Sequence, residues 1–180
     1  SPNAMVLADI YAWLGDAVKG LRGVEAARPH YERTRDYYRA SGRADDPFLG
    51  ETLALWAEAE CKAKHPARAA ALFAEARPIL APRNDNWSAK LLISEAECSL
   101  ASRRAPQAVA SASAAVAKLA PLSDADDSAD ARFVLARALW ETGARRRAAA
   151  EARRALASFE GSASKSADEL RAWLAAHPAR

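Results

Sequence analysis

The residues best suited to metal chemistry form one acidic cluster, Asp124-Ala125-Asp126-Asp127-Ser128-Ala129-Asp130. A calcium-binding loop of the EF-hand type uses carboxylates at this density, but it needs glycine at its sixth position and a bidentate glutamate at its twelfth. Those positions hold Ala129 and Leu135. We therefore interpret the cluster as a polar linker that ends in helix caps and first-turn carboxylates, which favour a helix N-terminus.

The histidines and cysteines are too dispersed for a metal site. His30, His65 and His177 have no second ligand four residues further on, as a helical zinc site would require. Cys61 and Cys98 are too few for a disulfide framework, and we expect both to be buried, reduced thiols, as in an intracellular protein. The chain also lacks a glycine-rich phosphate loop, a nucleophile elbow and a Cys-x-x-Cys motif. The sequence predicts no cofactor, no metal and no enzymatic activity.

One dense basic segment could contact nucleic acid or acidic lipid. It comprises Arg145-Arg146-Arg147 and Arg153-Arg154, in a chain with a formal net charge of only +3. Consecutive residues on a helix point about 100° apart, so Arg145, Arg146 and Arg147 point in different directions. A solvated outer face is the favoured interpretation. Nucleic-acid binding through residues 145–154 remains the alternative function.

Composition indicates a single all-α domain. Of the 180 residues, 51% are hydrophobic, and many of these are alanine, the best helix former. The longest apolar stretch is too short to span a membrane, and no signal-peptide core opens the chain, so we expect a cytoplasmic protein without a membrane partner. Residues 1–4, before Met5, are typical of an expression scar, which leaves open whether the chain is a fragment of a longer protein.

Alanines recur at helical spacing in four sets, two of which also contain an aromatic residue. The sets begin about 40 residues apart. The sets are Ala27 with Tyr31, Ala69 with Phe73 and Ala76, Ala108 with Ala112 and Ala115, and Ala148 with Ala152 and Ala155. About twelve residues ahead of each set stands another small residue: Gly15, Ala57, Ala96 and Ala136. Short breaks separate the two halves of each unit. Pro66 and Pro106 follow two of these breaks and suit the first turn of the next helix.

This pattern resembles the tetratricopeptide repeat (TPR), whose first helix carries a bulky residue, leucine and a small residue and whose second carries alanine, an aromatic and alanine. Trp13-Leu14-Gly15 with Ala27 and Tyr31 is similar to that signature. The units differ from the usual 34-residue repeat in being about 39 to 42 residues long. Divergent, lengthened arrays of this kind resemble regulatory or scaffolding parts of large bacterial signalling proteins.

The resemblance implies a right-handed α-α superhelix of four helical hairpins and a C-terminal capping helix, in one domain over residues 5–180. We expect repeats at 5–41, 47–81, 87–120 and 127–160. The nine expected helices are 5–21, 24–41, 47–64, 66–81, 87–103, 106–120, 127–142, 144–160 and 165–176. Stacking is required because one hairpin cannot bury its apolar face alone, and a capping helix over 165–176 would cover the last one.

The resemblance also implies a function, because the first helices of TPR hairpins line a concave groove that holds a peptide or a partner helix. The positions carried over are Asp9, Asp16, Glu51, Glu58, Lys90, Glu97, Phe133, Arg137 and Trp140. We expect a protein-interaction scaffold or sensor module for a segment with basic residues at one end and an apolar anchor at the other. Phe133 and Trp140 either face this groove or pack between repeats. Self-association is a further expectation for a helical array.

Overall fold

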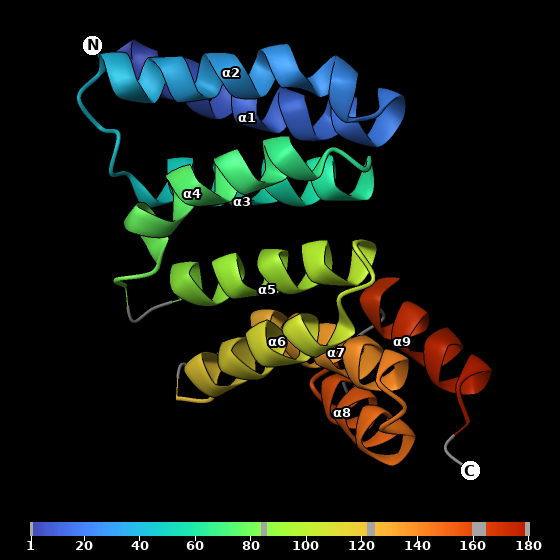
Figure 1. Ribbon diagram of the computed structural model, residues 1–180. Coiled ribbons are helices and arrows are strands. Elements are labelled where there is room, and N and C mark those ends of the chain that lie inside the picture. Colours follow the sequence, from blue (N-terminus) through green and yellow to red (C-terminus); the bar gives the residue numbers. More distant parts are fainter. Residues whose placement is uncertain (1, 84–85, 122–124, 160–164, 179–180) are drawn as a thin grey trace. The chain divides into compact units, whose positions relative to one another are not determined.

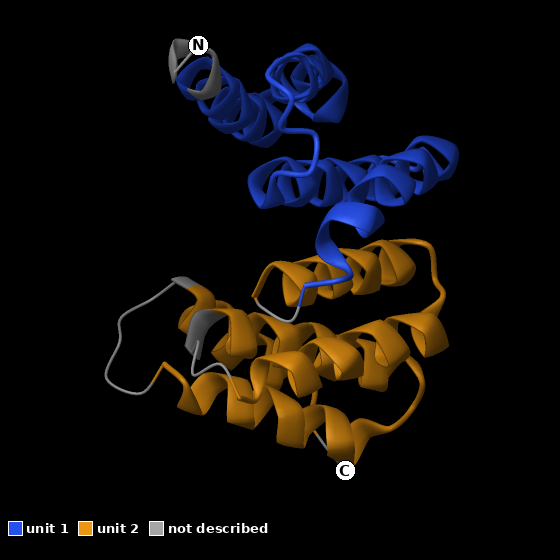
Figure 2. Ribbon diagram, turned by 90° about the vertical axis from the view of Figure 1, so that its left-hand side faces the viewer, with its two compact units in different colours: residues 1–83 blue, residues 84–180 orange. Residues whose placement is uncertain are grey.

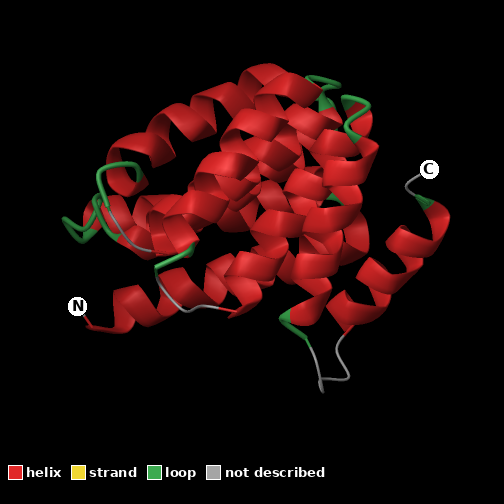
Figure 3. Ribbon diagram, turned by 90° about the horizontal axis from the view of Figure 1, so that it is seen from below, coloured by secondary structure: helices red, strands yellow, loops and turns green. Residues whose placement is uncertain are grey.

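The computed structural model describes residues 2–83, 86–121, 125–159 and 165–178, and in these ranges the chain is helical without any strand (Figures 1 and 3). Its helices are α1 (Pro2–Arg22), α2 (Val24–Ala40), α3 (Pro47–Lys62), α4 (Pro66–Leu80), α5 (Asn86–Ala101), α6 (Ala105–Leu119), α7 (Ala125–Glu141), α8 (Arg145–Ala157) and α9 (Lys165–Ala176). The predicted ranges are confirmed apart from shifts of up to three residues at their ends.

The helices fall into two compact units, Ser1–Arg83 and Asn84–Arg180 (Figure 2). Unit 1 contains α1 to α4 and unit 2 contains α5 to α9. In unit 1, α1 packs on α2 and α3 on α4, and α2 contacts α3. In unit 2, α5 packs on α6 and α7 on α8, α7 also contacts α5 and α6, and α9 packs on α8. The structure is thus an all-α arrangement of paired helices.

Small residues hold the paired helices close together. The predicted small positions Ala57, Ala96 and Ala136 are fully buried, as are Ala27 and Ala76. A Cβ atom on Gly15 would lie 2.7 Å from Cε1 of Tyr31, and one on Gly50 would lie 2.7 Å from Cγ of Leu80. At that separation a side chain would collide with its neighbour, so the approach of these helices depends on glycine.

All four hairpins turn through a residue in the left-handed backbone region. These residues are Gly23 (φ 84°), Lys64 (φ 65°), Arg103 (φ 56°) and Gly143 (φ 83°). In three of them the next residue donates back to the preceding helix: His65 N–H to Glu60 O at 2.8 Å, Arg104 N–H to Ser99 O at 2.8 Å, and Ala144 N–H to Leu139 O at 2.9 Å. This is the Schellman pattern, which satisfies helix-terminal carbonyls and favours glycine at the left-handed position.

The starts of α3, α4 and α6 also agree with the local sequence. Pro66 and Pro106 stand in the first turns of α4 and α6, where no backbone donor is needed. Asp46 caps α3, because its side chain accepts a hydrogen bond from Phe48 N–H at 2.9 Å, and Pro47 follows it. Local sequence therefore determines both where the helices begin and how each hairpin closes.

The turn geometry predicts opposite effects for two substitutions in unit 2. Replacement of Arg103 by Gly should raise the free energy of unfolding, and replacement of Gly143 by Ala should lower it, each by about 1 kcal/mol, because L side chains strain a left-handed residue. A Cβ on Gly143 would meet nothing within 4 Å, so backbone strain alone is measured. Urea unfolding followed by circular dichroism tests this. Equal stability of Gly143→Ala and the native chain would contradict it.

Candidate functional site

A buried ionic network joins the two hairpins of unit 1. Glu60 on α3 is fully buried, and Arg28 on α2 donates to both of its carboxylate oxygens, at 2.7 and 2.8 Å. Trp56 Nε1–H donates to Oε1 at 3.0 Å, and His65 Nδ1 lies 2.9 Å from Oε2. Burial raises the pKa of Glu60, but the hydrogen bonds from Arg28, Trp56 and His65 outweigh it and leave the pKa below its ordinary value.

A carboxylate, a histidine and an arginine in contact could suggest acid–base catalysis, but the burial favours a structural role. Glu60 has no exposed side-chain surface, and every one of its oxygen contacts is to its own unit. A substrate would have to displace Arg28 to reach it. Among the described residues, no group of three or more His, Cys, Asp or Glu side chains could hold a metal ion. The network therefore acts as an internal link between α2 and α3.

The predicted groove residues of unit 1 are engaged within the unit. Tyr38 donates its hydroxyl to Asp9 at 2.8 Å, and Tyr31 donates to Asp16 at 2.7 Å. Burial, reinforced by these carboxylates, raises the pKa of both tyrosine hydroxyls. Asp16 also pairs with Lys19 at 2.7 Å. These two carboxylates thus support the α1–α2 hairpin.

The remaining acidic positions of unit 1 differ from each other. Glu58 pairs with Lys62 at 2.6 Å along the outside of α3. Glu51 is half-buried near the start of the same helix. In unit 2, Lys90 lies over the ring of Trp87, with Nζ 5.2 Å from its centroid. Glu51 and Glu58 belong to unit 1 and Lys90 belongs to unit 2, and a binding role for these three residues stays a prediction.

Phe133, Arg137 and Trp140, the predicted groove residues nearest the C-terminus, lie close together in unit 2, but α9 packs against them. Trp173 of α9 makes edge-to-face contacts with Phe133 and with Trp140, each with ring centroids 5.9 Å apart. His177 contacts Trp140 edge-on at 4.7 Å and stacks on Trp173 at 4.3 Å. Both Phe133 and Trp140 are half-buried. Their rings therefore help to attach α9. Packing of this kind was the alternative to a role in the groove.

Arg137 links this corner to α5. Its Nη1 donates to Glu97 Oε1 at 2.5 Å, and its guanidinium lies 5.9 Å from the centroid of Phe133. Glu97 is almost fully buried. Sequence reasoning placed both residues along a groove, and the structure shows an ion pair between neighbouring helices instead. Their binding role stays a prediction.

The basic segment lies on the surface, as expected of a solvated charge run. Arg145, Arg146, Arg147, Arg153 and Arg154 are all exposed. Arg145 covers the ring of Trp140 at 5.1 Å, and Arg154 pairs with Glu151 at 2.6 Å. Part of the segment is thus engaged by its own unit. Nucleic-acid binding through this segment stays a prediction.

The cysteines depart from the prediction. Cys61 and Cys98 are both buried, at 5% exposure, as the helical pattern indicates. Neither is a free thiol in the structure, so the prediction of reduced cysteines is wrong. Burial inferred from an apolar pattern does not determine the oxidation state of a thiol. In the acidic cluster, α7 begins at Ala125, which leaves Asp124 outside the described residues.

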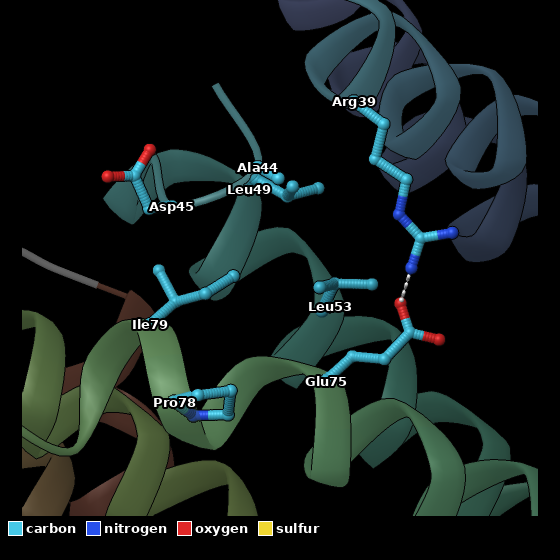
Figure 4. Close-up of a pocket in the computed structure, with 8 residues that line it drawn as sticks. All are labelled: Arg39, Ala44, Asp45, Leu49, Leu53, Glu75, Pro78 and Ile79. Atoms are coloured by element: carbon cyan, nitrogen blue, oxygen red, sulfur yellow. Dashed lines mark hydrogen bonds and ion pairs between the residues drawn. The ribbon is translucent and has the colours of Figure 1, made fainter. Parts of the chain in front are cut away.

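One pocket of unit 1 has an apolar floor and lies between α2, α3 and α4, with a volume of about 380 Å³ (Figure 4). Leu49 and Leu53 of α3 and Pro78 and Ile79 of α4 form its apolar part. Ala44, from the loop between α2 and α3, completes it. Such a pocket can bury an apolar side chain of a ligand.

Charged groups stand at both ends of this pocket. At one end Arg39 Nη2 donates to Glu75 Oε2 at 2.8 Å, the contact drawn as a dashed line in Figure 4. At the other end lies Asp45, an exposed residue whose carboxylate points away from the ion pair (Figure 4). No hydrogen bond or ion pair to Asp45 occurs in the described part of the chain. An unpaired carboxylate at the rim favours a cationic group on a ligand.

Sequence reasoning missed this pocket. None of its lining residues was among the predicted groove positions, although Leu49 and Leu53 lie on α3, the helix that carries the predicted Glu51 and Glu58. The available signal was the long polar loop at 41–46, opposite Pro78-Ile79 near the end of α4. A lengthened connection leaves room beside the following helix, but only the fold shows which side chains line it.

A second pocket of about 500 Å³ on unit 1 is lined by Tyr11, Arg33, Asp36, Tyr37 and Ala40. The rings of Tyr11 and Tyr37 stack with centroids 5.8 Å apart, and Arg33 donates to the Tyr11 hydroxyl at 3.1 Å. The polar and aromatic groups that could hold a ligand thus already contact each other. This arrangement makes the second pocket the weaker candidate.

The network around Glu60 predicts an acid-dependent loss of stability. Because the pKa of Glu60 is depressed in the folded state, its contribution is present above the ordinary value of 4.5 and is lost as pH falls through the folded pKa. Glu60→Gln should destabilise unit 1 by about 3 kcal/mol at neutral pH and flatten the pH dependence below 4.5. Glu58→Gln, two residues away, is the control and should change stability by less than about 0.5 kcal/mol. Urea unfolding between neutral and acid pH measures both.

The contacts of Trp140 predict that it stabilises unit 2. Trp140→Ala should lower the free energy of unfolding by about 2 kcal/mol, because it removes ring contacts with Trp173 and His177. Arg146→Ala, on the exposed face of α8, should be neutral. Denaturant unfolding compares the two variants. A Trp140→Ala chain as stable as the native one would instead restore Trp140 as a groove residue.

Comparison with known proteins adds no relative to this picture. No family model, no curated protein and no solved structure matches the chain. Among the described helices, none combines the length and apolarity needed to cross a membrane. The pocket and the surfaces of the two units are therefore the features that indicate function.

Proposed function

We propose that the protein is a non-enzymatic interaction module, and that the pocket of unit 1 binds a short segment of a protein partner. The observation that carries this proposal is the apolar pocket formed by α2, α3 and α4, with Asp45 at its rim. Its lining side chains include no thiol, hydroxyl or imidazole, so the pocket offers binding chemistry rather than a nucleophile or a neutral-pH base.

The chemistry of the pocket defines the segment that fits it. The apolar part accommodates a large aliphatic or aromatic anchor, and Asp45 attracts a lysine or arginine near that anchor. The Arg39–Glu75 ion pair at the opposite end presents both signs of charge and can accept main-chain groups of an extended peptide. The ligand class is therefore a peptide with an apolar anchor next to a basic residue.

The fold supports the same class of function. The four hairpin turns at Gly23, Lys64, Arg103 and Gly143 share one backbone conformation and recur at nearly constant spacing, as expected of a repeat. We propose on this basis that the chain is a divergent TPR-like array. Such arrays present binding surfaces on a rigid helical frame.

Selection from a displayed library of random peptides tests this proposal. Peptides enriched on the native chain should contain a large apolar residue within a few positions of lysine or arginine. Ala44→Phe should abolish their binding, because the new ring fills the pocket from an exposed position. Asp45→Lys should weaken it at least about tenfold and shift the preference toward acidic peptides. Fluorescence anisotropy with labelled peptides gives the affinities.

Ala67→Phe is the matched control, since Ala67 is exposed near the start of α4 and does not line the pocket. It should bind as the native chain does. Enriched peptides that bind Ala44→Phe as tightly as the native chain would refute the pocket as the site. Titration with labelled RNA and DNA at several salt concentrations distinguishes the alternative, because a phosphate-binding surface loses affinity steeply with salt.

A further inference from the structure

Helix α1 is apolar on two opposite faces. Its inner face consists of small residues, among them Ala8, Ala12 and Gly15, which are buried against α2. Its outer face carries six large apolar side chains that remain exposed: Val6 (58%), Leu7 (41%), Ile10 (45%), Trp13 (62%), Leu14 (41%) and Leu21 (85%). We call these six residues the α1 stripe. A surface helix normally has one apolar face, so the second requires an explanation.

The α1 stripe is unusual in both location and size. All the large apolar side chains that the structure describes as exposed belong to it. From Val6 to Leu21 it runs about 22 Å along the helix, at 1.5 Å per residue. With the exposed fractions above, its side chains present roughly 600 Å² of apolar surface, the upper end of the largest patch on a typical monomer. Patches of this size mark interaction surfaces.

We propose that α1 pairs in antiparallel orientation with α1 of a second copy of this chain, about a two-fold axis between Trp13 and Leu14. In such a pair, residues whose numbers add to 27 lie at the same height on the two helices. Ile10 then lies level with Ala17 of the second copy, and Leu7 level with Gly20 of the second copy. At these two levels large residues meet small ones, which is how packed helix surfaces interlock. Trp13 lies level with Leu14 of the second copy and Val6 level with Leu21, so large residues meet each other there.

Gly20 supports this register independently. Glycine inside a helix costs up to about 1 kcal/mol relative to alanine. Apart from its own stretch of helix, none of the described residues lies within 4 Å of where a Cβ on Gly20 would stand, so no described contact within the molecule requires glycine there. Close approach of a second helix does. Gly15, by contrast, is explained by the ring of Tyr31 inside the unit.

A parallel pair about the same stripe fits less well. Each residue would then face the equivalent residue of the second copy. Ile10 would meet Ile10 and crowd the interface, and Gly20 would meet Gly20 and leave a gap near the C-terminal end of α1. The antiparallel pair also sets the helix dipoles in opposite directions. Two stripes together bury roughly 1,200 Å², the lower bound for a stable protein–protein interface. A reversible dimer is the state that this area supports.

Sedimentation equilibrium of the full chain over a range of concentrations tests the dimer. The native chain should shift from monomer to dimer as concentration rises. Trp13→Glu should weaken dimerisation at least about tenfold, because it removes the largest exposed ring at the two-fold axis. Ala71→Glu, on the exposed side of α4, introduces the same charge away from α1 and should not affect the mass. Circular dichroism confirms that both variants keep their helices.

Orientation is tested with one double variant. Ile10→Glu alone should weaken the dimer, and adding Ala17→Lys should recover part of the affinity, because the antiparallel register sets each new glutamate level with a new lysine of the second copy. In a parallel pair like charges would meet, and the second substitution would give no recovery. A native chain that stays monomeric at every concentration, or a Trp13→Glu chain that dimerises normally, overturns the proposal. Peptide binding to the pocket is measured separately and does not depend on this outcome.

Discussion

The close approach of paired helices is the constraint from which the other features follow. Gly15 against Tyr31 and Gly50 against Leu80 leave no room for a side chain, and fully buried alanines occupy the equivalent positions along other helices. Small contact residues bury little apolar area individually, because hydrophobic stabilisation is proportional to the area removed from water. Tyr31 and Leu80 fill the space beside these glycines, and other large apolar residues lie between hairpins or on the outside of the molecule. The α1 stripe is one result of this division.

Polar links add to the apolar contacts between neighbouring hairpins. In unit 1 the link is Glu60, which accepts two hydrogen bonds from Arg28 and one from Trp56. In unit 2 Arg137 and Glu97 join α7 to α5. A buried carboxylate is tolerated only where its oxygens are satisfied, so these links fix how the helices are arranged as well as holding them. In this chain, ion pairs as well as hydrophobic contacts connect adjacent hairpins.

Much of the fold could be predicted from the sequence, because its signals are local. These signals are the helical spacing of alanines, the prolines in first turns and the Asp46 cap. Each of them influences only the few residues next to it. The site could not be predicted, since it depends on which faces meet. Carrying groove positions over from a repeat pattern gave Asp9 and Asp16, which the structure shows bound to tyrosines of α2. It also gave Phe133 and Trp140, which contact α9 through Trp173. The pocket beside Asp45 depends on a loop conformation that no periodic signal encodes.

The hairpin architecture has a consequence for how the chain reaches its folded state. Within each unit the side-chain hydrogen bonds that join different hairpins connect residues at most 40 apart, as for Arg35 with Glu75 and Arg137 with Glu97. Chains whose contacts are close in sequence fold rapidly, because little loop entropy is lost before a contact forms. Both hairpins of unit 1 are formed by residues 1–83. They can therefore form during synthesis, before the chain of unit 2 is complete.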